Sequence, residues 1–313
     1  ATSVKLYTTY RPTYYADDAT ILRLLKACAS LGLLPLVHCE NDDLVTARTE
    51  ALVREGKTGW QYHGCSRPAL AEQEAVQRML FLAEAAESPI HICHCSSPGS
   101  VALVAEARDS GQFATCETCP QYLLLDNGMY EGPEPWRYVL QPPLRDPEET
   151  DWLWAMVEGG MVDSIVTDHC DYTRAQKVAR DDFTQTPGGL PGLATLLPLM
   201  YTFGAASGRV TLPDLVGLLS TTPARVWGLW PRKGTLQPGS DADIVVYDPA
   251  PEGVISARTL HHVAGYTPYE GMPVQGRVKV TVSRGRIIYL EGRFVGREGR
   301  GRYLAREPLV GTA

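Results

Sequence analysis

The sequence predicts an α/β protein whose larger part is a parallel sheet covered by helices, followed by a smaller β-rich part. From residue 1 to about residue 230, short apolar runs alternate with longer helix-like stretches. Strands joined through helices pair in parallel, because each crossover needs about a dozen residues or more. After about residue 233 the pattern changes to short β-like runs set off by Gly and Pro, which is typical of a small β domain. We therefore divide the chain into residues 1–232 and residues 233–313.

The individual elements follow from local periodicity. Short apolar runs predict parallel strands at residues 4–7, 33–39, 89–95, 113–116 and 164–167. Apolar residues at helical spacing predict helices at residues 17–31, 67–87, 99–109 and 148–158. The C-terminal β-like runs are residues 244–247, 278–282 and 286–290. This alternation fits both a (β/α) barrel and an open, doubly wound sheet, although no GxGxxG motif favours a dinucleotide-binding sheet.

Composition excludes several classes of function. The chain has 313 residues, of which 44% are hydrophobic and 21% charged, as in a folded globular protein. Its net charge of −7 gives no basic surplus for a phosphate backbone, so we expect no nucleic-acid partner. No apolar run approaches the roughly 18 residues of a membrane span, so we expect no membrane partner. The eight cysteines are too sparse for a disulfide scaffold, which predicts reduced thiols and a cytoplasmic protein.

Three polar residues lie at the C-terminal ends of predicted parallel strands: His38, His94 and Asp168. A single histidine at a strand end is more often a hydrogen-bonded structural residue. In barrel enzymes, however, the strand C-termini open into the loops that carry catalytic groups. Two imidazoles and a carboxylate meeting there are a natural ligand set for a dication such as Zn²⁺. The sequence therefore predicts a metal site at this end of the sheet.

Lys5 stands within the apolar run Val4-Lys5-Leu6-Tyr7, where burial of its charge is costly. If Lys5 is buried, its pKa is lowered, and its neutral amine can form a carbamate with CO₂ and so bridge two metals. The simpler alternative, which these residues alone favour, is a lysine whose ammonium reaches solvent from the first strand.

Three further histidines are interpreted as structural or supporting residues rather than as metal ligands. His91 stands three residues before His94 and is expected to face the other side of the strand. His169 follows Asp168 directly and is a candidate to support it. His63 precedes a predicted helix and has no obvious partner.

An ordered set of short motifs resembles the dihydropyrimidinases and hydantoinases, which are cyclic amidohydrolases of the amidohydrolase superfamily. Each motif alone is weakly specific, whereas their order along nearly the whole chain is highly specific. The motifs are VHCEN at 37–41, HCSS at 94–97, ETCPQY at 117–122, PPLR at 142–145, TDHC at 167–170, PGGLPG at 187–192, PRKGT at 231–235, PGSDADI at 238–244, YTPYEG at 266–271 and GRGR at 299–302.

The resemblance implies a (β/α)8 barrel of the TIM type with a C-terminal β-sandwich portion, and a site with two divalent metals, expected to be zinc. By their positions in the motifs, Lys5 matches the carboxylated lysine that bridges the metals, and His38 and His94 match ligands of the second metal. Asp168 matches a ligand of the first metal that also acts as general base and then as general acid.

The resemblance also implies how the substrate, a small cyclic diamide, is held and opened. Tyr10 matches the tyrosine whose hydroxyl stabilises the developing oxyanion. Main-chain groups near the positions of Gln141 and Gly188 match those that hold the ring amides, although the family commonly has Ser and Asn at these two places. The expected product is an N-carbamoyl amino acid, and the expected assembly is a homo-oligomer, either a tetramer or a dimer.

The sequence departs from the family at one point. The His-x-His pair that binds the first metal on the family's first barrel strand is not found in these 313 residues. The chain thus offers four of the six expected ligands, and the resemblance implies that the first barrel strands and part of the β-sandwich are missing. We expect the chain by itself to be a poor catalyst.

Two kinds of alternative stay open at this point. One is a sister enzyme, such as an allantoinase or a dihydroorotase, although the PGGLPG and TPYEG segments favour a hydantoinase. The other is a non-catalytic relative, because the collapsin response mediator proteins share the fold but act as binding scaffolds without metal ligands. The presence of Lys5, His38, His94 and Asp168 argues against a scaffold.

Overall fold

The structure, a computed structural model, describes residues 2–308. Its first part is a five-stranded parallel sheet in the order β1-β2-β3-β4-β5. Its strands are β1 Ser3–Tyr7, β2 Leu34–His38, β3 Ile90–Ile92, β4 Ala114–Thr118 and β5 Ser164–Ile165. Strands that follow one another in the chain are neighbours throughout, as in a (β/α) barrel, whereas a doubly wound sheet reverses its strand order. The strand order therefore favours the barrel over the doubly wound alternative.

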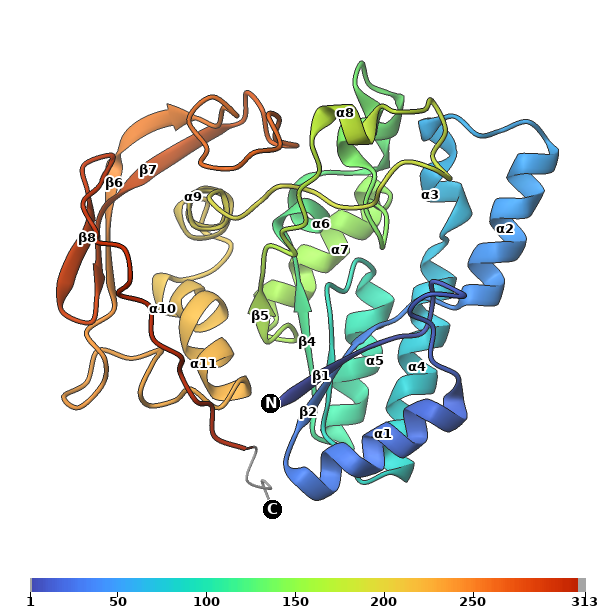
Figure 1. The fold of residues 1–313 in the computed structure, drawn as a ribbon, viewed down its shortest axis with the longest axis horizontal. Coiled ribbons are helices and arrows are strands. Elements are labelled where there is room, and N and C mark those ends of the chain that lie inside the picture. The colour runs from blue at the N-terminus through green and yellow to red at the C-terminus, as the bar shows by residue number, and fades with distance from the viewer. Residues whose placement is uncertain (1, 309–313) are drawn as a thin grey trace.

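The helices that connect these strands cover one side of the sheet (Figure 1). Helices α1, α4, α5 and α7 begin and end close to the predicted bounds, whereas α2 and the short helices α3 and α6 were not predicted. Only Asp42 and Val45 of α2 are buried, so this helix carries little apolar periodicity. The helices are α1 Asp18–Leu31, α2 Asp42–Arg54, α3 His63–Ser66, α4 Ala69–Ala85, α5 Pro98–Asp109, α6 Pro120–Leu124, α7 Pro147–Glu158, α8 Arg174–Lys177, α9 Leu196–Met200, α10 Leu212–Val216 and α11 Thr222–Val226, with π-helical turns at Tyr201–Ala206 and Gly217–Thr221 and 3-10 turns at Trp60–Tyr62, Asn127–Glu131 and Pro135–Tyr138.

Helix α1 shows how local sequence sets an element boundary. The Asp17 carboxylate accepts a hydrogen bond of 2.7 Å from the Thr20 backbone N–H, which satisfies one of the free donors of the first turn. Gly32 ends the helix in the left-handed region at φ 62°, where glycine pays no steric penalty. Between the caps, Ile21, Leu25 and Cys28 form the buried stripe that packs on the sheet.

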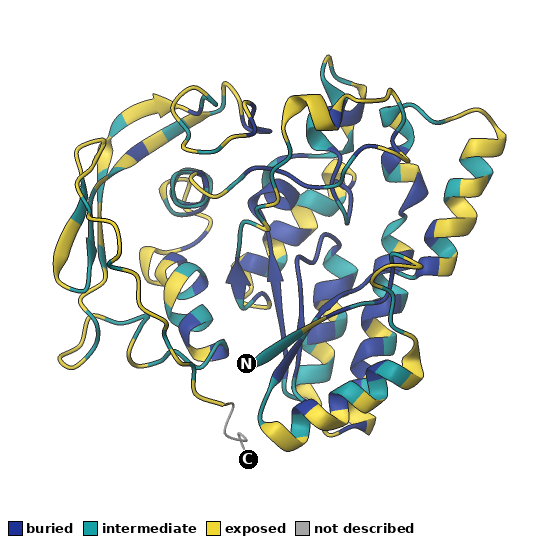
Figure 2. Ribbon diagram, viewed as in Figure 1, coloured by how far each residue is buried: buried dark blue, intermediate teal, exposed yellow. Residues whose placement is uncertain are grey.

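The core lies between the parallel sheet and its helices. Strands β3 and β4 are buried along their whole length, and Figure 2 shows the burial concentrated there and on the inner faces of the helices. Burial on both faces is typical of parallel strands that are covered from either side. The core thus holds the strand ends that carry His38 and His94.

The second part of the chain is a four-stranded antiparallel sheet in the order β6-β7-β8-β9. Its strands are β6 Ile244–Val254, β7 Pro273–Ser283, β8 Arg286–Leu290 and β9 Arg293–Phe294. They contain the three predicted runs and are largely exposed, and helices α9 to α11 lie between the two sheets (Figures 1 and 2). The division at residue 232 stays a prediction. Among residues 2–308, no helix is both long and apolar enough to cross a membrane.

Candidate active site

Three of the predicted site residues share an unusual backbone conformation. Tyr10, His94 and Asp168 have φ values of 76°, 37° and 45°, in the left-handed region that side chains rarely adopt. Each follows a strand of the parallel sheet, where the chain turns out of the strand into the next loop. Such strained positions cluster at functional sites, because the surrounding structure must hold them.

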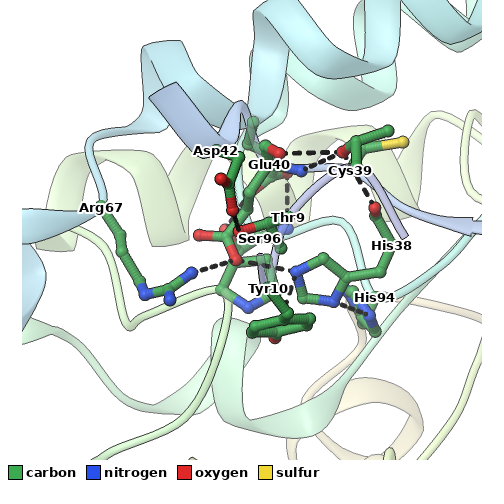
Figure 3. A network of polar contacts seen from close by, with 12 residues as sticks. Thr9, Tyr10, His38, Cys39, Glu40, Asp42, Arg67, His94 and Ser96 are labelled. Carbon is green, nitrogen blue, oxygen red and sulfur yellow. Dashed lines mark hydrogen bonds and ion pairs between the residues drawn. The ribbon is translucent and has the colours of Figure 1, made fainter. Parts of the chain in front are cut away.

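His38 and His94 meet at the ends of β2 and β3. His38 Nδ1 lies 3.0 Å from His94 Nε2, and both rings are buried (Figure 3). Burial lowers the pKa of both imidazoles, which favours the neutral, metal-binding form. The structure therefore brings the two predicted ligands together, while metal binding itself stays a prediction.

Glu40 determines which nitrogen of His38 carries the hydrogen. Its carboxylate lies 2.7 Å from His38 Nε2 and 2.6 Å from Arg67 Nη1 (Figure 3). Burial alone raises the pKa of Glu40, but Arg67 and His38 outweigh it and lower the pKa to about 2. Because an ionised carboxylate only accepts hydrogen bonds, His38 Nε2 must donate. His38 Nδ1 is then left with a free lone pair that points at His94.

A second buried ion pair supports the loop that carries His94. Glu72 of α4 accepts hydrogen bonds from the backbone N–H groups of Ser96 and Ser97, at 3.0 and 3.2 Å. Arg145 binds the same carboxylate at 2.9 Å and donates to Ser96 Oγ at 2.9 Å. All of these side chains are buried, so the loop after His94 is fixed by charge-assisted hydrogen bonds.

Lys5 departs from its prediction in two respects. The side chain is exposed rather than buried. Desolvation by the surrounding atoms acts to lower the pKa of Lys5, but Cys93 and Glu117 outweigh it, and the pKa is raised. The interpretation of Lys5 as a buried lysine with a lowered pKa is therefore wrong for this structure. The exposed side chain agrees with the simpler alternative, and the pKa is raised by two partners that the sequence did not reveal, Cys93 directly after β3 and Glu117 on β4. A carbamate at Lys5 stays a prediction.

Asp168 and Tyr10 lie near the other predicted site residues, Asp168 near Lys5 and Tyr10 near His38. The Asp168 side chain is exposed, yet desolvation by surrounding protein atoms raises its pKa to about 6, with Lys5 opposing and Glu117 adding to the shift. The Tyr10 hydroxyl lies 3.4 Å from His38 Nε2, and burial raises its pKa. Tyr10 therefore keeps its proton at neutral pH and can donate a hydrogen bond.

His91, Cys93 and Glu117 form a further group with metal-ligand chemistry. Their ligand atoms lie within 4.8 Å of one another. His91 Nδ1 lies 2.8 Å from Thr115 Oγ1, and its Nε2 lies 3.1 Å from the Glu117 carboxylate. Because Cys93 and Glu117 also act on the pKa of Lys5, this group is a neighbour of the proposed ligands rather than a separate site.

The two predicted substrate-binding positions also lie together. Both Gln141 and Gly188 are partly buried, and a Cβ atom at Gly188 would lie 2.9 Å from Gln141 Cδ. Sequence reasoning missed the groups that support the site, namely Glu40, Arg67, Glu72 and Arg145. The signal available for Glu40 was its place in the VHCEN motif, two residues after His38.

The donor set fits a dication. Two nitrogen ligands of one zinc ion, each about 2.0–2.1 Å from it, lie about 3.3 Å apart in a tetrahedral site. The 3.0 Å contact between His38 Nδ1 and His94 Nε2 is close to this separation. A ligand histidine commonly donates its other N–H to a carboxylate, and the contact of His38 with Glu40 has this form.

Comparison with known proteins identifies the class. The amidohydrolase family model matches residues 3–288. The chain therefore belongs to the amidohydrolase family.

Its relatives narrow the kind of amidohydrolase. The D-phenylhydantoinase of Escherichia coli O1:K1 is 41% identical over 311 residues, which cover 98% of this chain and 67% of that protein. The D-hydantoinase from Bacillus sp. AR9 matches with a TM-score of 0.96 and 38% identity, over 99% of this chain and 68% of that chain. The dihydropyrimidinase from Brevibacillus agri NCHU1002 matches with a TM-score of 0.96 and 37% identity, over the same shares.

The chain thus spans about two thirds of the length of these relatives. Their names confirm the predicted family, and their structures confirm the predicted fold class. The expectation of a cyclic amidohydrolase is confirmed at the level of the family.

Proposed function

We propose that the chain carries most of the active site of a metal-dependent hydrolase that opens the cyclic amide bond of dihydropyrimidines or 5-substituted hydantoins. The product is an N-carbamoyl amino acid. The observation that carries this proposal is the pair of buried, neutral imidazoles 3.0 Å apart, with Glu40 fixing the tautomer of His38. The names of the relatives support the substrate class.

Four residues would hold two divalent metals, which we expect to be zinc, with a carboxylated Lys5 as the bridge. The other ligands are His38, His94 and Asp168. Metals bound there would supply Lewis-acid activation of water and of the ring carbonyl.

The chain's own residues then perform the proton transfers and the positioning. The Asp168 carboxylate takes a proton from the attacking water and passes it to the ring nitrogen as that nitrogen leaves. The Tyr10 hydroxyl, which keeps its proton, donates a hydrogen bond to the oxygen where negative charge develops. Main-chain groups near Gln141 and Gly188 hold the ring amides and orient the scissile bond.

The test compares four substrates on the zinc-loaded protein: dihydrouracil, a 5-substituted hydantoin, allantoin and dihydroorotate. It is run on these 313 residues, from which little turnover is expected, and again together with a segment that carries the family's His-x-His pair. Ring opening of either of the first two supports the proposal. Turnover of allantoin or dihydroorotate alone would replace it with the sister activity. Tight metal binding without turnover of any of the four, with the His-x-His segment present, would point to a scaffold protein instead.

Two finer properties belong to the same proposal. We expect a homo-oligomer, a tetramer or a dimer, which light scattering on the purified protein tests. We also expect a cytoplasmic protein, which fractionation of the source cells tests.

A further inference from the structure

Lys177, the last residue of α8, is a buried cation outside the metal site. It is 0% exposed, and its ammonium donates to the carbonyl oxygens of Val139, Pro187 and Gly189 at 2.7, 2.8 and 3.0 Å. An ammonium has three N–H donors, so each donor has one acceptor. In the described part of the chain no carboxylate lies within ion-pair distance of it, so these carbonyls offset the cost of its burial.

The three carbonyls belong to the two segments that the proposed function assigns to the substrate. Val139 precedes Gln141 by two residues, and Pro187 and Gly189 flank Gly188. The segments also touch directly, because the Gly189 backbone N–H donates to the Val139 carbonyl at 3.1 Å. The buried ammonium of Lys177 therefore connects the two segments.

His63 fixes the first segment at the next carbonyl. Its Nε2 lies 2.7 Å from the Leu140 carbonyl oxygen. Burial lowers the pKa of His63 to about 3, so the ring is neutral and donates from Nε2. Two successive carbonyls, those of Val139 and Leu140, are thus held by buried side chains, immediately before Gln141.

The second segment is fixed on its other side by the loop after Asp168. The Cys170 backbone N–H donates to the Leu190 carbonyl at 3.0 Å. Gly189 has a φ of 152°, and a Cβ atom there would lie 2.5 Å from the Cys170 carbonyl oxygen. His169 Nδ1 accepts hydrogen bonds from the next backbone N–H groups, those of Gly192 and Leu193. The segment held by Lys177 is therefore packed against the loop that carries Asp168.

We propose that Lys177 is a positioning residue for the substrate: its ammonium sets the spacing of the Val139–Gln141 and Pro187–Gly189 segments and does not touch the substrate itself. This inference rests on the proposed function, because that function makes the two segments the ring-binding groups. Charge-assisted hydrogen bonds are shorter and stronger than neutral ones. One ammonium shared by three carbonyls thus resists movement of either segment.

The kinetic test uses two variants of equal side-chain length in the zinc-loaded protein at about pH 6.5, below the lowered pKa of Lys177, where its ammonium keeps all three donors. Lys177→Met removes all donors, whereas Lys177→Gln keeps an amide that donates. We expect KM for the cyclic amide to rise about tenfold in Lys177→Met and less in Lys177→Gln, with kcat and zinc content close to those of the unchanged protein. Lys233→Met, which removes an ammonium paired with Asp241 in the C-terminal part, is the control and leaves KM unchanged.

Hydrogen–deuterium exchange gives a readout that does not depend on activity. We expect the backbone amides of Leu140, Gln141, Gly188 and Gly189 to exchange faster in Lys177→Met and, to a smaller extent, in Lys177→Gln. If Lys177→Met fails to fold, Lys177→Gln and its exchange carry the test alone.

The outcomes separate this inference from the proposed function. Unchanged KM and unchanged exchange in both variants would overturn the positioning role. A parallel loss of kcat and zinc content would also overturn it, because that pattern indicates general damage to the site. If the unchanged protein opens no cyclic amide at all, the proposed function fails, while the exchange data still decide whether Lys177 couples the two segments.

Discussion

The metal half and the substrate half of the candidate site are constructed in opposite ways. In the metal half the functional groups are side chains, and the ends of β2 and β3 bring His38 and His94 together at 3.0 Å. In the substrate half the proposed functional groups are main-chain atoms. The buried ammonium of Lys177 donates hydrogen bonds to carbonyls of the two segments that carry them. A substitution in the first half would therefore remove a proposed ligand outright, whereas one in the second half would act through geometry.

The largest effect is expected from His94→Ala in the metal half. The variant removes one of the two paired nitrogens, so we expect loss of one zinc ion and a fall in turnover on the order of 10³-fold. Elemental analysis and turnover of a hydantoin measure the two effects together. His261→Ala, which changes an exposed histidine of the C-terminal part, is the matched control. Full zinc content in His94→Ala would show that His94 is not a ligand.

The metal half was largely predictable from the sequence. His38, His94 and Asp168 each end a predicted strand, and strand C-termini in parallel sheets meet at one edge. What the pattern could not show is the left-handed backbone of Tyr10, His94 and Asp168, because it arises from how the loops pack. It also could not show the raised pKa of Lys5, because Cys93 and Glu117 come near it only through the strand register.

A smaller effect is expected from Glu40→Gln, which changes the support of a ligand rather than the ligand. The amide no longer holds His38 Nε2–H with a full negative charge, so we expect zinc affinity to fall about 10–100-fold. The variant also leaves Arg67 buried without its partner, so the protein should unfold at a lower temperature. Competition with a chelator below that temperature measures the affinity.

Glu55→Gln, which removes an exposed carboxylate paired with Lys57, is the control for that variant. We expect it to bind zinc as the unchanged protein does. Equal affinity in Glu40→Gln would mean that His38 is oriented by the Tyr10 hydroxyl or by packing instead.

The substrate half was hardly predictable. Gln141 and Gly188 came from the family resemblance alone, and Lys177 stands in a short helix with no distinctive pattern around it. Its acceptors lie on segments 38, 10 and 12 residues away, so only the folded chain shows the contact. The same holds for His63, whose acceptor on Leu140 is 77 residues away.

In the substrate half, the titration of buried Lys177 should make the stability of the protein depend on pH. Burial lowers the pKa of Lys177 from 10.5 to about 7, so the ammonium that donates to the three carbonyls is the form present below about pH 7, and the neutral amine above it keeps two of the three donors. Between these values the unfolded chain holds a proton that the folded chain has lost, so stability rises with pH. Relative to that of Lys177→Met, the free energy of unfolding of the unchanged protein should rise by up to about 1.4 kcal/mol per pH unit from pH 7 to about pH 10. Below pH 7 this difference should not change with pH.

Urea unfolding of both proteins at pH 6, 7, 8 and 9 measures this difference. A difference that stays constant over the four values would contradict the prediction. It would mean that the three carbonyls keep Lys177 charged throughout.

The smallest effect is expected from Gln141→Ala, and it separates side-chain from main-chain recognition. If the main chain at this position holds the ring, truncation of the Gln141 side chain leaves those atoms in place. We expect KM to change by less than about threefold, as for substitutions that remove no essential contact.

Gly189→Ala is the variant to compare with Gln141→Ala, because its Cβ atom would lie 2.5 Å from the Cys170 carbonyl oxygen and would displace the backbone itself. KM should therefore rise in Gly189→Ala while it stays nearly constant in Gln141→Ala. The reverse order would show that the Gln141 amide binds the substrate directly, and the substrate half would then be constructed from side chains like the metal half.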